Sequence, residues 1–188
     1  MAERLTQAAV VERAGALADE IGLGEVTITK LGRALGIAPP GVYRHVADLA
    51  DLHGAIGEQA AHEVAAVLSG TCAGLSGRDA LAAIGGTLRG WAAEHPGRYA
   101  ALQIAPDPGD APGLAAAEEV LGVIASALRA YQLAGDDLTD AIRLIRSTVH
   151  GFVGLELGGG FKQARDPDAT FGRIVDSLDA VLRTWTSR

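Results

Sequence analysis

The stretch of residues 26–53, VTITKLGRALGIAPPGVYRHVADLADLH, constrains the possible folds of this chain more than any other. In its first part, Ile28, Leu31 and Leu35 recur at the spacing that places apolar side chains on one face of a helix. Thr27 precedes them, and its hydroxyl is suited to accept a hydrogen bond from a free N–H of the first helical turn. The pattern therefore predicts a short helix that begins after Thr27.

A tight turn and a second, very short helix are predicted next. Gly36 tolerates the left-handed backbone conformation that ends a helix and turns the chain. Pro39 and Pro40 have φ angles suited to a first helical turn, where a missing N–H costs nothing. A helix that runs only from there to His45 gains little from its own hydrogen bonds and must be held by its neighbours. Two short helices joined in this way are typical of a helix-turn-helix, whose second helix enters the major groove of DNA.

The segment ITKLGRALGIAPPGVYRHVADLADL resembles the DNA-binding segment of the TetR family of transcriptional regulators. The resemblance is carried by residues that match the family pattern: Leu31, Gly32, Leu35, Gly36, Ile37, Val42, Tyr43, His45 and Val46. It implies an all-α fold, with a three-helix helix-turn-helix domain over residues 1–47 and a six-helix ligand-binding and dimerisation domain over residues 48–188. HGFVGLELGGGF at residues 150–161, followed by a D-x-x-F-x-R-x-x-D helix, is similar to the WHG branch of the family.

The resemblance and the chemistry of the side chains together select the candidate DNA contacts. Arg44 is the candidate for base reading, because a guanidinium can bond guanine O6 and N7 together; the alternative is an ordinary solvated arginine. Tyr43 and His45 are expected to contact phosphate, or else to fill the core at a helix end. Thr27 is expected to contact phosphate, or to act only as a cap. The full candidate set is Thr27, Thr29, Lys30, Pro39, Pro40, Gly41, Tyr43, Arg44 and His45.

Two positions depart from the usual pattern of the family. Leu49 stands where many relatives have a lysine that contacts phosphate at the start of the fourth helix. We expect the positive end of that helix and its backbone amides to supply this contact instead. Ala38 stands where many relatives have a capping serine, and the loss of that cap should cost about 1 kcal/mol.

The charge distribution is unusual for a DNA-binding protein, because the net charge is −7. Between residues 26 and 47, however, Lys30, Arg33 and Arg44 occur without any acidic residue. Because phosphate attraction depends on local contacts, we expect sequence-selective DNA binding with a weak non-specific component. The single cysteine, Cys72, excludes an intrachain disulfide and fits a reducing compartment. With no signal-peptide pattern and no uncharged run long enough to span a bilayer, a cytoplasmic protein is expected.

Apolar periodicity and capping residues predict helices along the rest of the chain. These helices cover about residues 7–21, 49–69, 78–94, 95–103, 113–133, 136–157 and 167–185, with a Pro-rich loop at residues 104–112. The last two carry the clearest apolar stripe, which needs a substantial partner surface. The resemblance implies that this surface is a second copy of the chain. The predicted dimer interface comprises Leu138, Ile142, Ile145, Val149, Phe152, Phe171, Ile174, Val175, Leu178, Val181, Leu182 and Trp185.

Polar and aromatic side chains on the otherwise apolar C-terminal helices are candidates for a ligand pocket. Each residue by itself is more simply explained as a structural residue, and His150 could instead bond across the dimer. As a set they are the expected polar anchors of an apolar pocket. The set comprises His62, Trp91, His95, Tyr99, Gln103, Tyr131, His150 and Glu156.

These observations predict a ligand-responsive transcriptional regulator rather than an enzyme. The resemblance implies a homodimeric repressor that a small, mostly apolar effector releases from a palindromic DNA operator. No cofactor or metal site is expected, since His62-Glu63 lacks a second histidine at the zincin spacing and no Cys/His cluster has metal geometry. A small-molecule-binding helical protein with a weak or vestigial DNA-binding head remains an alternative, because residues 1–53 carry seven acidic and five basic residues and include Leu49. An all-helical enzyme is a further alternative, although no residue set suggests one.

Overall fold

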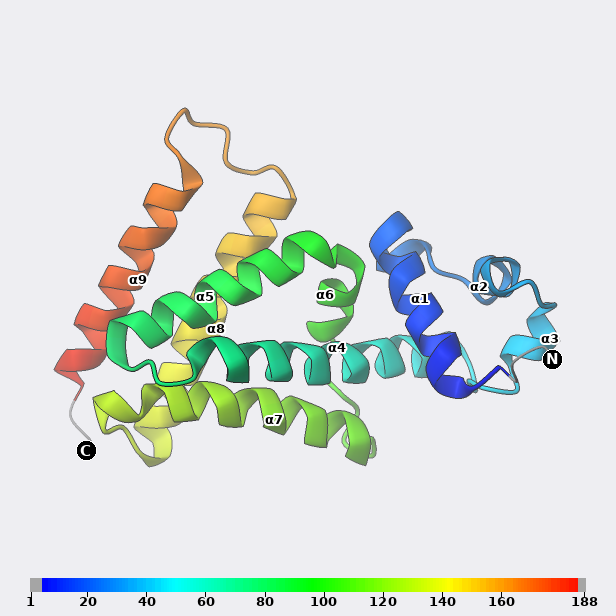
Figure 1. Ribbon diagram of the computed structural model, residues 1–188, viewed down its shortest axis with the longest axis horizontal. Helices are drawn as coiled ribbons and strands as arrows, with labels where there is room; N and C mark the ends of the chain where they lie inside the picture. Colours follow the sequence, from blue (N-terminus) through cyan, green and yellow to red (C-terminus); the bar gives the residue numbers. More distant parts are fainter. Residues whose placement is uncertain (1–4, 186–188) are drawn as a thin grey trace. The chain divides into compact units, whose positions relative to one another are not determined.

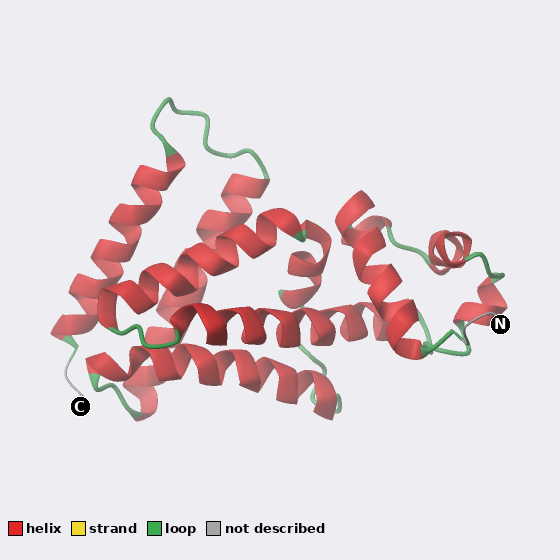
Figure 2. Cartoon of the chain, in the orientation of Figure 1, coloured by secondary structure: helices red, strands yellow, loops and turns green. Residues whose placement is uncertain are grey.

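The computed structural model describes residues 5–185, and every regular element in this range is helical (Figures 1 and 2). Three α-helices precede residue 48 and six follow it, which confirms the predicted all-α fold. The α-helices are α1 (Gln7–Ile21), α2 (Ile28–Leu35), α3 (Pro39–Val42), α4 (Leu49–Cys72), α5 (Gly77–Glu94), α6 (Pro96–Leu102), α7 (Ala111–Ala127), α8 (Gly135–Leu157) and α9 (Pro167–Thr184). Two 3₁₀ helices, η1 (Leu23–Glu25) and η2 (Leu128–Tyr131), complete the elements.

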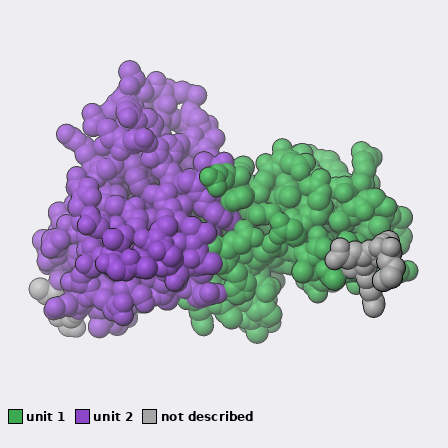
Figure 3. Space-filling view, in the orientation of Figure 1, with its two compact units in different colours: residues 1–63, 94–118 green, residues 64–93, 119–188 purple. Residues whose placement is uncertain are grey.

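The described chain divides into two compact units (Figure 3). The first unit contains the chain up to Glu63 together with residues 94–118, and the second contains residues 64–93 and the chain from Glu119 onward. The first unit thus includes α6 and much of α4 as well as the helix-turn-helix. These bounds differ from the domain boundary expected between residues 47 and 48, which stays a prediction about the functional division.

Local signals predicted the helix starts well. Thr6 and Thr27 accept hydrogen bonds from the N–H groups of Ala9 and Lys30, at 3.2 and 3.1 Å. Asp166 caps α9 in the same manner, by accepting from the N–H of Asp168. Capping side chains accept hydrogen bonds from the otherwise unsatisfied N–H groups of the first turn. They therefore indicate where a helix begins even when the helices that pack against it are unknown.

Several helix ends differ from the sequence-based expectation. α3 ends at Val42, and the next three residues form a turn instead of continuing the helix to His45. Ala38 offers this helix no side-chain cap, and a single helical turn gains little stability from its own hydrogen bonds. α4 continues to Cys72, past the glycine at which a break was expected, and α7 begins within the predicted loop.

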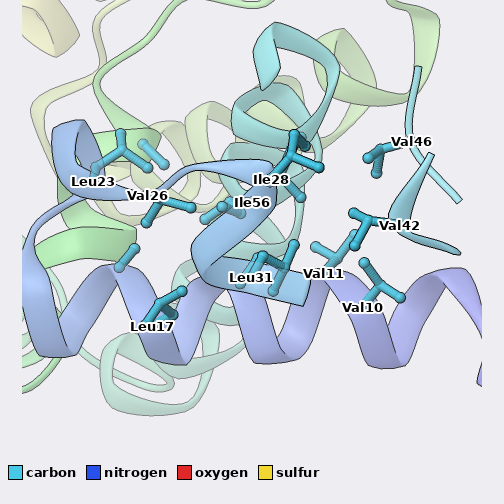
Figure 4. Close-up of a cluster of buried hydrophobic side chains, with 14 residues drawn as sticks. Val10, Val11, Leu17, Leu23, Val26, Ile28, Leu31, Val42, Val46 and Ile56 are labelled. Carbon is cyan, nitrogen blue, oxygen red and sulfur yellow. The ribbon is translucent and has the colours of Figure 1, made fainter. Parts of the chain in front are cut away.

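The core of the first unit is formed by aliphatic side chains from α1, η1, α2, α3 and α4. Figure 4 shows them pointing toward one another, with Leu31 of α2 between residues of α1 and α4. Val10, Val42 and Ile56 are essentially inaccessible to solvent. The helix-turn-helix is therefore held by tertiary packing, as its short helices require.

The second unit is built around α5, α8 and α9. Gly85 of α5 lies against the Phe171 ring of α9, where a methyl group would come within 2.7 Å of a ring carbon. Arg89, one turn further along α5, bonds both oxygens of Glu156 at 2.5 and 2.6 Å and lies over the rings of Phe152 and Phe171. This arrangement joins the three helices through one guanidinium, because its fork bonds a carboxylate while its face stacks on aromatic rings.

One stretch of the described residues, Ala111–Tyr131, has the length and composition of a membrane span, and 28% of it is buried. Glu118 and Glu119 lie near the middle of this stretch. Two carboxylates at that depth are costly in hydrocarbon, so we interpret the stretch as a surface helix.

Candidate nucleic-acid interface

The turn between α2 and α3 has a fixed geometry. Gly36 adopts the left-handed conformation, with φ 69° and ψ 26°, and the N–H of Ile37 donates to the carbonyl oxygen of Gly32 at 2.9 Å. A methyl group at Gly32 would lie 2.8 Å from the carbonyl oxygen of Ile37. Glycine at both positions therefore lets α3 lie close to α2.

The polar end of α3 is presented to solvent. Val42 and Val46 are buried in the core of the first unit, whereas the Tyr43 side chain between them is 54% exposed and Arg44 is also exposed. This exposure rules out the interpretation of Tyr43 as a core residue. His45 is half-buried, and its N–H donates to the carbonyl oxygen of Val42 at 2.9 Å.

The remaining candidate DNA contacts lie on the same helix-turn-helix. Pro40 and Thr29 are exposed, whereas Pro39 and Gly41 are half-buried. Thr27 is exposed and caps α2, so a role in capping is observed and a phosphate contact remains a prediction. Lys30 is engaged by Glu25 of η1, with 2.8 Å between the ammonium nitrogen and a carboxylate oxygen.

The start of α4 is capped by Asp48, as the sequence predicts, but it is more acidic than a phosphate-binding helix end should be. Asp48 accepts from the N–H of Asp51 at 2.9 Å, and Asp51 accepts from the N–H of Ala47 at 2.7 Å. Two carboxylates therefore occupy the end of the helix that was expected to bind phosphate through its amides. Their negative charge makes this end a poor anion site, because a phosphate would have to displace or approach both of them.

The eight predicted pocket residues do not all lie in one unit. His62, His95, Tyr99 and Gln103 belong to the first unit, whereas Trp91, Tyr131, His150 and Glu156 belong to the second. Several of them have structural partners. His95 lies 3.3 Å from Asp19, Glu156 binds Arg89, and the Tyr131 hydroxyl donates to Asp179 at 2.6 Å.

Burial shifts the pKa of several of these side chains, Tyr99 and His150 among them, without indicating a reaction. Tyr99 is buried in the first unit, and this burial raises the pKa of its hydroxyl to about 12. Burial, with a smaller effect of Arg146, lowers the pKa of His150 to about 4. Both groups are therefore neutral at physiological pH, as expected for side chains in an apolar environment.

The second unit has a surface pocket of about 390 Å³ near the end of α9. Its lining residues are Gly77, Ala130, Tyr131, Gln132, Arg183 and Trp185. Tyr131 is the only member of the predicted pocket set among them. The ligand pocket therefore stays a prediction.

The predicted dimer interface divides into buried and outward-facing residues. Seven of its members are buried within the second unit of a single chain: Ile145, Val149, Phe152, Phe171, Val175, Leu178 and Leu182. A helical stripe shows that a helix needs a partner, and here much of that partner belongs to the same chain. Leu138, Ile142, Ile174 and Trp185 are half-buried and Val181 is exposed, so only these five can contact a second copy without rearrangement.

Sequence reasoning missed an ion-pair cluster between α1, α4 and α6. The Arg98 guanidinium lies 3.1 Å from Glu12, 3.4 Å from Asp19 and 3.3 Å from Glu63. The Arg98 N–H also donates to Asp19 at 2.9 Å. Because these partners are 35 to 86 positions away in the sequence, no local pattern could have paired them.

Within residues 5–185, no group of three or more His, Cys, Asp and Glu side chains has an arrangement suited to a metal ion. The polar groups that follow α3 are exposed directly beside side chains that are buried in the core of the first unit. This arrangement is suited to recognition of a macromolecular surface.

Comparison with known proteins agrees with this geometry. Residues 81–178 match the family described as "Tetracyclin repressor-like, C-terminal domain". An uncharacterised HTH-type transcriptional regulator of Mycobacterium tuberculosis, Rv0681, is 32% identical over 185 residues, which cover 98% of this chain and 84% of the relative.

Two solved structures illustrate the fold. A TetR variant from Acinetobacter baumannii AYE, in complex with minocycline, has a TM-score of 0.70 at 22% identity and covers 97% of this chain and 100% of its own. BioQ with its double-stranded DNA operator has a TM-score of 0.65 at 22% identity, covering 94% of this chain and 99% of its own. The family match and the M. tuberculosis relative establish that the chain belongs to the TetR family of HTH-type transcriptional regulators and is not an enzyme.

Proposed function

We propose that this regulator binds a roughly palindromic operator as a homodimer, with one α3 per half-site in successive major grooves. A small, mostly apolar effector would bind residues 48–188, favour a conformation whose two heads are wrongly spaced for DNA, and so relieve repression. The effector can shift this balance only by its differential affinity for the two conformations. Such a protein acts in the cytoplasm, where its operator is.

The exposure of Tyr43 and Arg44 at the end of α3 carries the DNA-binding part of the proposal. Val42 and Val46 are buried in the core, so the backbone that carries the two exposed side chains is anchored on both sides. We assign base reading to Arg44, phosphate contact to Tyr43, His45, Thr29 and Lys30, and apolar or backbone contact to Pro39, Pro40 and Gly41. The operator complex of BioQ supports this mode of binding for the fold.

Substitution of Arg44 by alanine should relax discrimination at one base position by about 1–3 kcal/mol. The reason is that its guanidinium can make a bidentate contact that only one base pair satisfies. Arg33→Ala is the matched control, because Arg33 is an exposed arginine on α2 and should weaken all duplexes uniformly. The measurement is competition binding with operators altered one base pair at a time, and unchanged discrimination in Arg44→Ala would remove Arg44 from this role.

We predict that the homodimer forms through the outward-facing residues of α8 and α9. Val181, which is 42% exposed, should lie within the interface, so Val181→Asp should shift sedimentation from dimer to monomer while leaving the helix content unchanged. A carboxylate buried without a partner costs several kcal/mol, about enough to dissociate a micromolar dimer. Ala180→Asp places the same charge on an exposed neighbouring position and should remain dimeric.

Phe171 and Leu178 are unsuitable for this experiment because both are buried within one chain, and a charge there would unfold the second unit. If Val181→Asp sediments as the same dimer as the wild type, this face is not the interface.

The alternative is a small-molecule-binding protein whose DNA-binding head is vestigial. It is favoured by the two carboxylates at the start of α4 and by Leu49 in place of a cationic residue. A mobility shift on the DNA upstream of the protein's own coding region separates the two functions. Retardation that weakens with added salt supports the regulator, and no retardation at low salt supports the alternative.

The ligand-responsive part of the proposal rests on the family and on the eight candidate pocket residues. The TetR variant bound to minocycline supports small-molecule binding for the fold. Candidate anchors are His62, Trp91, His95, Tyr99, Gln103, Tyr131, His150 and Glu156.

A further inference from the structure

Glu25 lies beside the helix-turn-helix and pairs with a candidate DNA contact. It ends η1, and its carboxylate oxygen lies 2.8 Å from the ammonium nitrogen of Lys30 in the first turn of α2. The Lys30 side chain is 42% exposed and that of Glu25 is 70% exposed. The pair therefore lies at the surface, where a charged ligand can reach it.

The pair changes the electrostatics of the interface. Lys30, Arg33 and Arg44 are the three cationic residues between positions 26 and 47, and of these only Lys30 forms an ion pair among the described residues. A glutamate carboxyl is ionised at neutral pH, and the hydrogen bond to Lys30 lowers the pKa of Glu25 further, so both members of the pair are charged. An ammonium that already neutralises a carboxylate has less to gain from a phosphate.

We propose that Glu25 masks Lys30, so that a DNA phosphate must displace this carboxylate before Lys30 can contact the backbone. The inference rests on the proposed DNA-binding function, and it identifies Glu25 as a residue that limits affinity. Because the masked charge would contact phosphate and no base edge, Glu25 should weaken binding to every duplex by a similar factor. It should also reduce the salt dependence of binding, since the neutral pair contributes no net charge to counterion release.

The experiment uses an operator obtained by selecting the DNA that the protein retains from a library of random duplexes. It measures the dissociation constants of full-length wild type and Glu25→Gln on this operator and on a scrambled duplex, at several salt concentrations. We expect Glu25→Gln to bind both duplexes about three- to tenfold more tightly at low salt, with a slope of log K against log salt that is steeper by about one. Glu20→Gln is the matched control. Glu20 is an exposed glutamate of α1 that pairs with Arg13 at 2.9 Å, so the substitution removes the same charge away from Lys30.

The Lys30→Met background tests whether Glu25 acts through Lys30. In that background Glu25→Gln should change affinity no more than Glu20→Gln does in the wild type. The masking would be overturned if the two glutamate substitutions changed the DNA affinity of the wild type equally. It would also be overturned if Glu25→Gln raised the affinity as much without Lys30 as with it. If the wild type binds neither duplex, the proposed function fails and the inference fails with it. If the wild type binds but Glu25→Gln and Glu20→Gln have the same affinity, only the inference is overturned.

Discussion

Replacement of Gly97 by alanine should destabilise the first unit by about 3 kcal/mol or more, although the change only replaces one hydrogen atom with a methyl group. Gly97 lies in the first turn of α6, directly against the backbone of α1. A methyl group there would lie 2.1 Å from the carbonyl carbon and oxygen of Ala18 and 2.5 Å from the nitrogen of Asp19. Backbone atoms cannot rotate away as a side chain can, so α6 would have to move off α1.

Urea unfolding of the wild type and the variant measures this effect. The matched control is Gly90→Ala, near the C-terminal end of α5, where a new methyl group meets no atom within 4 Å. Since alanine is the better helix former, this control should be neutral or more stable by up to about 1 kcal/mol. A Gly97→Ala variant as stable as the wild type would show that α6 is not docked on α1 in this way.

The second large effect is expected at Arg98, one residue further along α6. Its side chain is 11% exposed and lies among the carboxylates of Glu12, Asp19 and Glu63. Arg98→Met keeps much of the aliphatic volume but leaves three acidic groups facing one another without a cation. We expect a loss of about 3 kcal/mol, the lower end for a broken buried ion pair, because Glu12 and Glu63 also reach solvent.

Arg13→Met is the control for Arg98→Met. Arg13 lies on α1 and pairs with Glu20 at 2.9 Å, but the two side chains are 34% and 57% exposed, so this pair is much closer to solvent than the Arg98 cluster. Such surface pairs contribute at most about 1 kcal/mol, so the control should unfold close to the wild type. Equal losses in the two variants would mean that the Arg98 cluster stabilises the unit no more than an ordinary surface pair.

Both predicted effects concern the attachment of α6 to α1. α6 is fixed to α1 by direct backbone contact at Gly97 and by the charges around Arg98. Both contacts lie within the first unit, which also contains the helix-turn-helix. A movement of α6 would therefore act on α1 directly.

The features that sequence predicted well are those determined by neighbouring residues. Thr27 was identified as a cap because a cap needs only the backbone N–H groups two or three positions later. The turn at Gly36 was likewise predicted, since a left-handed residue after a helix favours glycine. The family motif predicted that Tyr43 contacts phosphate, and its side chain is exposed as such a contact requires.

The features that sequence could not predict depend on distant partners. The stripe through Phe171 and Leu178 indicated a buried face, but periodicity cannot distinguish a partner helix in the same chain from one in a second copy. The start of α4 is an exception, because its signals are local: the predicted cap at Asp48 is confirmed, and only the second carboxylate, that of Asp51, was overlooked. The contact between Glu25 and Lys30 had no signal in the sequence, since it depends on how η1 leads into α2.

The most direct test of the central claim is selection of DNA by the purified protein from a library of random duplexes, followed by sequencing of the retained molecules. A regulator that presents one α3 per protomer should enrich a palindromic consensus whose half-sites lie in successive major grooves, about one helical turn apart. A folded protein that enriches no sequence would contradict the account, and would favour a ligand-binding protein whose helix-turn-helix no longer reads DNA.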